Sequence, residues 1–340
     1  MNKPVLCIGD ANADLIIQLG QTESIQSKNL EILSAGHVDA SPDQVVMSAG
    51  GVIGTTACTM AAQGCPTLFL GHGGDDYFGR FVKGYLEEKG VDTRYYTLLP
   101  TAPSLMVFCL ISPDGERDFR PFPFNGSAPT QVTAEDLPED LTDHISVFFT
   151  SGVQLTEQPV CDTVLEMMRR CNEAGIPVAF DINLRTNTFG WGDEMKRRFA
   201  SALSHADIIF GSADEELPQV TGTDSEREAV QKLLASGNKT VVAKNGGKGS
   251  AVYAAGHRTA IGPFPVPIVD TVGAGDTFNG GYLAALRQGC SVEESLLWAS
   301  ATAAYTLSFE GAGHQPTHHQ VRSIIERFSH IRPETEDFRP

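Results

Sequence analysis

The feature that most constrains the fold is an alternation of short apolar runs with helical patterns, which becomes regular from about residue 145 onward. Many runs are continuously apolar, as in strands of a parallel sheet that are buried on both faces. The runs cover residues 5–8, 67–70, 105–111, 147–149, 176–180, 208–210, 240–243 and 251–253. The sequence therefore predicts an α/β fold with a doubly wound, mostly parallel sheet between helices.

Two of the segments between the runs carry a clear helical spacing. Apolar residues recur at i, i+3, i+4, i+7 and i+8 from Phe78 to Leu86, and Gly90 follows as a stop. A similar pattern runs from Val160 to Cys171, with Gly175 as its stop. The 340 residues could form two domains, but we expect one α/β domain with a lid over residues 1–330.

Two regions, about residues 12–48 and 95–128, do not follow this alternation. Residues 112–116 read Ser-Pro-Asp-Gly-Glu, a turn signal between two extended runs. We expect antiparallel strands outside the main sheet that cover, as a small β-sheet lid, a site at the carboxyl ends of the sheet strands. Residues 331–340 contain two prolines and mixed charge, and are predicted to be a loosely ordered tail.

The charge excludes two classes of partner. Lys and Arg total 25 and Asp and Glu total 42, so the formal net charge is −17. A chain this acidic repels polyanions, so nucleic acid and anionic membrane surfaces are not expected partners. Any anionic substrate must meet a few local positive groups.

The cysteines and the apolar segments bear on location. Seven cysteines form an odd set without a C-x-x-C pair, which argues against a disulfide framework or zinc site and favours reduced core cysteines. Residues 1–9 do not resemble a targeting signal. Residues 44–74 carry no charge, but polar residues and Pro66 interrupt them, so they are not a membrane span. We therefore expect a cytoplasmic protein.

The strongest local signal is the run Asp-Thr-Val-Gly-Ala-Gly-Asp at residues 270–276, which follows an extended segment and precedes a long helical pattern. Small residues at Gly273, Ala274 and Gly275 let backbone N–H groups turn toward an anion at a helix N-terminus. Asp276 inside such a turn is a candidate to orient or deprotonate a hydroxyl beside a transferring phosphoryl group. The alternative is a capping aspartate with glycines that allow tight packing.

Two commoner nucleotide fingerprints are not met. A dinucleotide-binding G-x-G-x-x-G would need glycine at position 278, which is Phe278. A phosphate loop ending in G-K-[ST] fails at Lys248, because Gly249 follows it. Both failures disfavour a dehydrogenase and a P-loop enzyme.

Residues 270–283 resemble the C-terminal signature of the ribokinase-like (PfkB) carbohydrate kinase family. Further blocks resemble that family in the same order, at residues 9–14, 49–51, 73–79, 181–185 and 244–246. The resemblance implies a ribokinase-like fold, with eight or nine strands between helices and a small β-lid. It also implies an enzyme that transfers the γ-phosphoryl group of ATP to a sugar hydroxyl, with Mg²⁺.

Carried over by position, the resemblance makes Asp276 the catalytic base. The backbone of Gly273, Ala274 and Gly275 would form an anion hole for the developing phosphoryl charge. Asp270 would match a monovalent-cation (K⁺) ligand of some members.

The sugar-binding segment is expected in the first part of the chain. Asn12 and Asp14 would exchange hydrogen bonds with sugar hydroxyls, and Gly50 and Gly51 would form a hinge and sugar-contact turn. Thr55 stands where the family often has asparagine.

The nucleotide and metal contacts are expected later in the chain. Lys244, Gly246 and Gly249 would lie by the phosphates and ribose, and Gly311 and Gly313 would border the adenine pocket. Glu216 would hold Mg²⁺ through water, although Ala213 replaces the asparagine of the family's N-x-x-E block.

The acceptor stays open at this point. Arg185 resembles the arginine of fructokinase-like and 2-keto-3-deoxygluconate kinase-like members, and a guanidinium can hold a carboxylate bidentately. Residues 125–128 resemble the lid segment of sugar-acid kinases, but Phe124 stands where that segment often has arginine, and a Gly-Gly-Lys typical of phosphosugar acceptors is absent at residues 50–52.

Two alternatives remain. A nucleoside kinase would need an aromatic lid pocket, which Phe119, Phe122 and Phe124 could supply. A nucleotide- or sugar-binding regulator without turnover would fit the Ala213 departure. In either case the resemblance implies a homodimer formed through lid strands, whose exposed edges invite pairing.

Overall fold

The computed structural model describes residues 3–18, 45–111, 117–311 and 313–338. Its main sheet has ten strands in the order β14-β13-β12-β11-β10-β9-β8-β1-β4-β5. The pairs from β5 to β11 are parallel, whereas β12, β13 and β14 join antiparallel. The strands are β1 (Val5–Ile8), β4 (Thr67–Gly74), β5 (Asp92–Leu99), β8 (Val147–Ser151), β9 (Val178–Asp181), β10 (Ile208–Ser212), β11 (Thr240–Lys244), β12 (Ser250–Ala254), β13 (His257–Ile261) and β14 (Glu334–Asp337).

The predicted α/β architecture is confirmed, and the burial pattern explains why the apolar runs were continuous. All residues of β1 are buried. Leu6 and Ile8 belong to one hydrophobic cluster, and Val5 and Cys7 belong to another. Because successive side chains of a strand point to opposite faces, the sheet has a core on each side. Each of the eight predicted runs overlaps a strand, and the sheet has ten strands rather than eight or nine.

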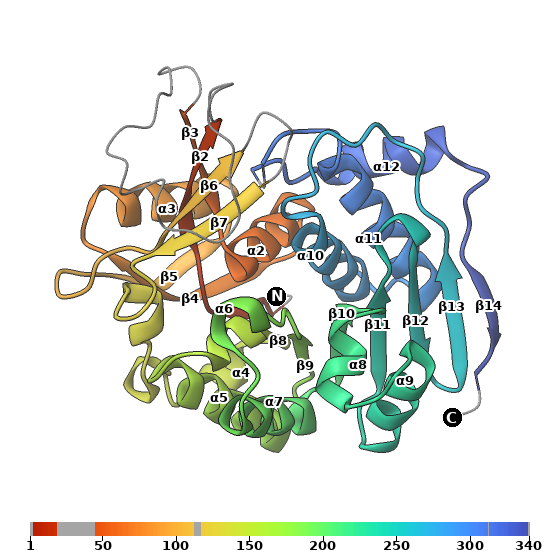
Figure 1. Cartoon of the computed structure of the whole chain (residues 1–340), viewed down its shortest axis with the longest axis horizontal. Helices are drawn as coiled ribbons and strands as arrows, with labels where there is room; N and C mark the ends of the chain where they lie inside the picture. Colours follow the sequence, from red (N-terminus) through yellow and green to blue (C-terminus); the bar gives the residue numbers. More distant parts are fainter. Residues whose placement is uncertain (1–2, 19–44, 112–116, 312, 339–340) are drawn as a thin grey trace.

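Helices cover both faces of the sheet (Figure 1). One face packs against α2 (Val52–Ala62), α3 (Tyr77–Glu88), α10 (Ala274–Arg287), α11 (Val292–Thr306) and α12 (His318–Arg327). The other packs against α4 (Leu141–His144), α5 (Val160–Ala174), α7 (Asp193–His205), α8 (Glu216–Thr221) and α9 (Glu226–Ala235). The short helices are α6 (Thr186–Phe189), η2 (Ala128–Gln131), η3 (Ala134–Asp136), η4 (Gly152–Leu155) and η5 (Gly246–Lys248). The two helices predicted from spacing are α3 and α5, and Gly175 ends α5 in the left-handed conformation.

A second sheet of four strands stands apart from the main sheet, in the order β3-β2-β6-β7 (Figure 1). These strands are β2 (Asn12–Gln18), β3 (Val45–Gly50), β6 (Met106–Ile111) and β7 (Arg117–Phe122). The outer pairs are antiparallel as expected, but β2 and β6 pair in parallel. Strand β5, part of which was assigned to the lid, belongs to the main sheet. Residues 19–44 of the predicted lid and its turn at 112–116 lie outside the described residues.

The prediction of a loosely ordered tail is wrong. Strand β14 pairs antiparallel with β13, and the Phe338 N–H donates to the Gly256 carbonyl. Phe338 is buried, and its ring lies edge-on to Tyr253 at 4.7 Å. A polar, proline-flanked segment gives no periodic signal, so only the long-range pairing with β13 shows that it is a strand.

Two expectations about the whole chain can be compared with the described residues. None of the helices there is both long and apolar enough to cross a membrane. No disulfide joins the seven cysteines, and all except Cys290 are buried. Their burial matches the expected core role.

Candidate active site

The N-terminus of α10 has no capping side chain and borders a cavity. Gly273 is its N-cap, with φ at 73° in the left-handed region, where glycine carries no Cβ penalty. The helix then begins at Ala274, and Asp276 lies in its first turn. Backbone N–H groups of a first turn lack intrahelical acceptors, and the helix dipole favours negative charge there. The local structure is therefore a cradle suited to an anion.

Asp276 lies in this cradle and has a high proton affinity. Burial, followed by the negative charge of Asp181, raises the pKa of Asp276 to about 7, against the opposing effect of Lys244 and Arg185. The Thr56 hydroxyl of α2 donates to the Asp276 carbonyl at 3.1 Å. Helices α2 and α10 lie side by side, so α2 holds the first turn of α10 in position (Figure 1). A carboxylate with this pKa can accept a proton near neutral pH.

A buried ion pair lies beside the same helix. Lys244 ends β11, and its Nζ lies 3.0 Å from Asp181 Oδ1 at the end of β9 and 3.3 Å from Asn279 Oδ1 on α10. Burial lowers the pKa of Lys244, but the charges of Asp181 and Glu216 outweigh it and the net pKa is raised. A Cβ on Gly275 would lie 3.7 Å from Lys244 Nζ. The ammonium group therefore lies next to the first turn of α10.

Glu216 follows β10, the strand that lies between β9 and β11. Its Oε1 accepts the Leu184 N–H and its Oε2 the Ser212 N–H, both at 2.7 Å. Burial and the charge of Asp181 raise the pKa of Glu216, while Lys244 opposes them. Among the described residues, no three His, Cys, Asp or Glu side chains gather into a metal cage. Mg²⁺ commonly keeps several waters and binds one or two carboxylates plus substrate phosphates, so a carboxylate held in this way fits a water-mediated ligand.

Asn12 and Asp14 point to the same side of β2, at the end of the lid sheet nearest α2. The Asn12 amide donates to Asp14 Oδ1 at 2.6 Å. Burial raises the pKa of Asp14 to about 7, with the Asn12 hydrogen bond lowering it and the charge of Asp10 raising it. Gly50 pairs opposite Asn12, and a Cβ there would lie 2.0 Å from Asp14 Oδ2. The glycine therefore makes room for the carboxylate.

Asp10 connects this sugar-side segment to the helices. Its Oδ2 accepts the Val52 N–H of α2 at 2.8 Å, and its Oδ1 accepts the Gln154 amide at 2.7 Å. Burial raises the pKa of Asp10. Its charge also raises the pKa values of Asp14 and Asp276. Gly51 adopts φ 93°, and a Cβ there would lie 2.8 Å from the Asp10 carbonyl oxygen, so the turn tolerates only glycine.

Thr55 lies behind this segment. Its Oγ1 is buried and has no hydrogen-bond partner within the described structure. It lies beside Ala11, Gly50, Tyr85 and Gln315, in a gap too small to hold a water molecule. The predicted substrate-binding hydroxyl therefore backs the Gly50 turn from the core side.

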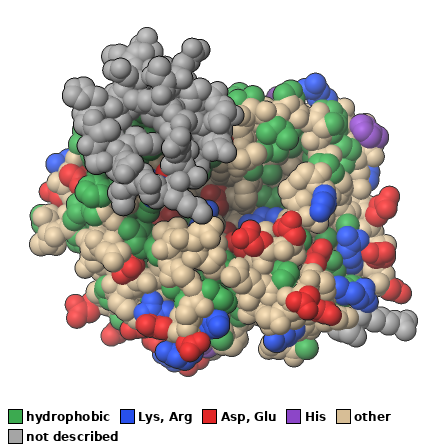
Figure 2. All heavy atoms as spheres, viewed as in Figure 1, with side chains coloured by type: hydrophobic (Ala, Val, Ile, Leu, Met, Phe, Trp, Pro, Cys, Tyr) green, Lys and Arg blue, Asp and Glu red, His purple; other side chains and the backbone are tan. Residues whose placement is uncertain are grey.

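A cavity of about 350 Å³ lies on the other side of the α10 N-terminus. Its walls include Lys244, Gly246, Gly249, Ala274 and Gly275, and apolar side chains line the rest: Phe264, Ile268, Phe278, Ala303, Ala304 and Leu307. Figure 2 shows a hollow near the middle of this face, with apolar and basic side chains inside it and acidic side chains on its rim. A cavity that is apolar at one end and faces a helix N-terminus at the other suits a flat ring that carries phosphates.

Gly311 and Gly313, the residues predicted to border the adenine pocket, lie against the lid sheet. A Cβ on Gly311 would lie 3.1 Å from Ile16 Cδ1 of β2, and one on Gly313 would lie 2.9 Å from Ser48 Oγ of β3. Neither residue lines the nucleotide-sized cavity. Asp270 ties this loop to the α10 turn, because its Oδ1 accepts the Val272 N–H and its Oδ2 the Gly311 N–H. Both residues therefore contact the lid sheet, and their place at the border of an adenine pocket stays a prediction.

Arg185 follows β9, its side chain is exposed, and its charge acts on Asp276. Its Nε donates to Asn183 Oδ1 at 2.9 Å, and the Asn183 amide donates to Asp181 Oδ2 at 3.3 Å. Asn183 adopts φ 37°, a left-handed conformation that asparagine tolerates better than most residues. Phe124 packs on Phe189 of α6 with ring centroids 4.7 Å apart, next to this turn.

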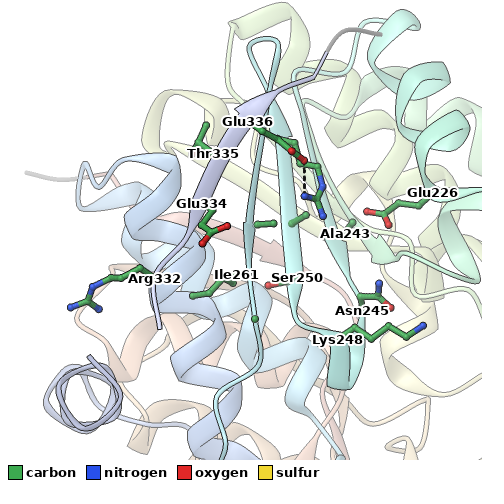
Figure 3. A pocket seen from close by; sticks show the side chains of 14 residues that line it. Glu226, Ala243, Asn245, Lys248, Ser250, Ile261, Arg332, Glu334, Thr335 and Glu336 are labelled. Carbon is green, nitrogen blue, oxygen red and sulfur yellow. Dashed lines mark hydrogen bonds and ion pairs between the residues drawn. The ribbon is translucent and has the colours of Figure 1, made fainter. Parts of the chain in front are cut away.

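A further groove of about 420 Å³ crosses the outer strands of the sheet, on the other side of the η5 turn (Figure 3). Lys248 and Arg332 lie at opposite sides of it with their charged ends turned away from its floor. Arg258 Nη1 donates to Glu336 Oε1 at 2.9 Å, and the Tyr253 hydroxyl donates to Glu226 Oε1 at 2.8 Å. These contacts hold the outer strands together, and neither Asp276, Gly275 nor Lys244 lines this groove.

The sequence predicted the α10 turn, Lys244 and Glu216 as parts of one site, but it assigned no role to three further residues that lie there. Asp181, Asn279 and Asp10 were in quoted motifs without a role. The signals existed: Asp181 and Lys244 both end parallel strands, and Asn279 is three residues after Asp276 on the same helix face. Asp76, by contrast, caps α3 through Gly79 and belongs to the scaffold.

The chain is similar to known carbohydrate kinases over most of its length. The sequence profile described as pfkB family carbohydrate kinase matches residues 2–319. Fructokinase-1 of Zea mays is 32% identical over 287 residues, 82% of this chain and 88% of that protein. Aminoimidazole riboside kinase of Salmonella typhimurium is 32% identical over 322 residues, 92% of this chain and 91% of that protein. The crystal structure of a fructokinase with bound ATP from Xylella fastidiosa superposes with a TM-score of 0.82 at 24% identity, covering 97% of this chain and 100% of that one.

Proposed function

The chain belongs to the pfkB family of carbohydrate kinases and is an ATP-dependent carbohydrate kinase, and we propose that its acceptor is a hydroxyl of a sugar or sugar acid. One observation carries this proposal. Asp276, a carboxyl with its pKa raised to about 7, lies in the uncapped first turn of α10, between the nucleotide-sized cavity and the sugar-side segment around Asp10. Residues 1–330 would act as one kinase domain with a lid.

Asp276 would act as the base of the transfer. It would take the proton of the acceptor hydroxyl as the hydroxyl oxygen forms its bond to the γ-phosphorus and the bond to the bridging oxygen of ADP breaks. The N–H groups of Gly273, Ala274 and Gly275 would stabilise the charge on the phosphoryl oxygens. These groups are positioned before the reaction by the left-handed Gly273 and by the Thr56 hydrogen bond.

Asn12 and Asp14 would bind the sugar. Asp14 can accept from a hydroxyl, and Asn12 can both donate and accept. Gly50 and Gly51 would let the ligand approach the backbone. Thr55 would support this turn from behind.

The nucleotide would occupy the cavity lined by Lys244, Gly246 and Gly249. Glu216 would hold Mg²⁺ through water, and the ion would neutralise phosphate charge when bound. Asp270 stays a proposed ligand region for a monovalent cation such as K⁺. Its two backbone hydrogen bonds connect the α10 turn to the Gly311 loop, so an ion there would affect both.

Two acceptor classes follow from different observations. Arg185 beside Asp181 and Asn183 supplies a guanidinium near Asp276, which favours an acceptor with hydroxyls and a carboxylate or keto oxygen. The Phe124–Phe189 pair and the similarity to aminoimidazole riboside kinase favour a nucleoside instead.

A panel of ketoses, aldoses, sugar acids and nucleosides with ATP and Mg²⁺, read by ADP release, tests the proposal. We expect turnover with one acceptor class and none with the others. If the acceptor is a sugar acid, Arg185→Met should abolish the selectivity for it. If the acceptor is a nucleoside, Phe124→Ala should weaken its binding. An absence of turnover with every acceptor, despite thermal stabilisation by a ligand, would leave a binding protein and overturn the kinase assignment.

We also propose a homodimer formed through the lid. Among the described strands, β3 and β7 are the edges of the lid sheet, and Val46, Phe119 and Phe122 on them are exposed. Unpaired edges with apolar side chains favour association. Light scattering should give twice the mass of the chain, and Phe119→Glu with Phe122→Glu should give the monomer mass.

A further inference from the structure

Lys244 holds a charge where a stable core does not need one. Its side chain is 19% exposed, and the side chain of its partner Asp181 is fully buried. Buried ion pairs often contribute no more stability than apolar residues of similar size, because both charges lose their hydration. A pair retained at the edge of a cavity therefore points to a role in binding or chemistry.

The partners of Lys244 leave its ammonium group with spare capacity. Two of its three N–H donors are directed to Asp181 Oδ1 and Asn279 Oδ1. No other acceptor within hydrogen-bonding distance occurs among the described residues. Because lysine only donates, it also fixes the Asn279 amide with Oδ1 toward Nζ, and Asn279 Nδ2 is left buried without a partner in the described part of the chain.

The position of Nζ indicates what the third donor would meet. It lies next to the Gly275 backbone and on the wall of the nucleotide-sized cavity. Asp276 is close enough to act on the charge of Lys244. A phosphoryl group that lies between the α10 N–H groups and Asp276 would thus lie within reach of Lys244.

We propose that Lys244 is a catalytic residue: its ammonium group binds the transferring phosphoryl group at the N-terminus of α10, and Asp181 and Asn279 are positioning residues that hold it there. This inference rests on the proposed kinase function. As the hydroxyl oxygen bonds to phosphorus and ADP departs, the hydroxyl proton goes to Asp276. Lys244 keeps its protons and stabilises the equatorial oxygens.

A second lysine, next to the same strand, supplies a control. Lys239 immediately precedes β11, at the end opposite Lys244, and pairs with Asp207 at 2.8 Å, but its side chain is 76% exposed. Lys239→Met thus removes the same charge from a similar ion pair, far from the cavity. An exposed pair of this kind contributes little, so this variant should keep wild-type kinetics.

The test compares Lys244→Met, Lys244→Arg and Lys239→Met in kcat and in the dissociation constants of ATP and ADP without acceptor. We expect Lys244→Met to lower kcat by about 100-fold or more, the loss typical of removing one such donor. ATP binding should weaken by about tenfold or more, whereas ADP binding should change by less than about threefold. Lys244→Arg should recover part of both losses because it keeps the charge.

A double-mutant cycle tests the positioning role. Asp181→Asn should lower kcat in the wild-type background but add less than about threefold in the Lys244→Met background, because its remaining effect passes through Lys244. Both are measured above pH 8, where Asp276 is ionised, so that the effect of Asp181 on the pKa of Asp276 does not enter. The double variant also removes both buried charges, so it should fold even if Lys244→Met alone leaves Asp181 uncompensated and does not. The ratio of the ATP and ADP dissociation constants of the double variant then shows whether Lys244 contacts the γ-phosphoryl group.

Two results would overturn the inference. One is a kcat of Lys244→Met within about threefold of wild type, and the other is an equal loss of ATP and ADP affinity, which would indicate only general nucleotide contact. A failure of the kinase proposal is distinguishable, since wild-type protein would then turn over no acceptor at all.

Discussion

Two carboxyls of this protein, Asp276 and Asp14, have pKa values raised to about 7, but they belong to different parts of the molecule. Asp276 lies on a helix of the main α/β body among fixed charges of both signs, namely Asp181, Lys244 and Arg185. Asp14 lies on a lid strand and has the neutral Asn12 amide as its hydrogen-bond partner, against a glycine wall. Burial is the largest cause in both.

The difference in neighbours matters more than the shared pKa. Charged side chains of both signs lie around Asp276, and they can stabilise charge that develops during proton transfer beside a phosphoryl group. Around Asp14, hydrogen-bonding capacity remains without opposing charge, which suits recognition of neutral hydroxyls. Asp10 acts on both carboxyls, so the two halves share one electrostatic field.

The sharpest way to break this comparison is Asp276→Asn. Without a proton acceptor, kcat should fall by roughly 100- to 10,000-fold, the range of general base catalysis. The dissociation constant of ATP should stay near the wild-type value, because the amide fills the same space. Single-turnover measurements of ADP formation check this. Turnover close to wild type would remove Asp276 from the chemistry.

Asp14→Asn should affect binding rather than turnover. Losing a charged acceptor for a sugar hydroxyl costs roughly 1.5–3 kcal/mol, so KM for the acceptor should rise by about 10- to 150-fold. KM for ATP should not change. Steady-state kinetics with both substrates varied separate these effects. A fall in kcat as large as that of Asp276→Asn would show that the two carboxyls do not differ in role.

Gly50→Ala tests the lid side without changing a charge. The added methyl would lie 2.0 Å from Asp14 Oδ2, so the carboxylate must move away from its present place. We expect KM for the acceptor to rise by about tenfold, at the lower end of the loss from a displaced hydrogen bond to a charged group. Gly84→Ala is the matched control, since a Cβ there meets nothing within 4 Å and should leave KM unchanged. Equal KM values for the two variants would contradict a contact role for Asp14.

The smallest expected effect concerns stability and pH. Unfolded aspartate ionises near pH 4, whereas folded Asp276 and Asp14 keep their protons to about pH 7. Between these values the folded state binds more protons, so each group lowers the free energy of unfolding as pH rises, by up to about 1.4 kcal/mol per pH unit. Each Asn variant lacks this loss.

Melting temperatures at pH 5 and pH 8 check the sign. Relative to wild type, Asp276→Asn and Asp14→Asn should be more stabilised at pH 8 than at pH 5. Asp143→Asn on the exposed surface of α4 serves as the control and should show no such trend. A difference that shrinks toward pH 8 would mean that these carboxyls are ionised throughout in the folded protein.

The parts of the fold that the sequence predicted are those encoded locally. Continuous apolar runs become buried strands because each residue of a doubly covered sheet needs an apolar side chain. The α10 turn was also readable, because Gly273 must adopt a positive φ and Asp276 must follow it within one turn.

The failures share a physical cause. Strand β14 is polar, and it forms only because it pairs with β13. Even the paired residues that are closest in sequence, Ala260 and Glu334, are 74 positions apart. The contacts of Gly311 with Asp270 and of Gly313 with β3 were not predicted either. Such contacts depend on how distant segments meet, and no local pattern records that.

The sequence by itself determined the fold class, the family and the residue types at the phosphoryl site, since periodicity and backbone requirements are properties of neighbouring residues. Only the tertiary structure decided that Lys244, Asp181 and Asn279 converge, that the Thr55 hydroxyl is buried, and that Asp10 acts on both Asp14 and Asp276. These relations arise where separate strands end at one edge of a sheet, and charge interactions depend on distance in space rather than along the chain.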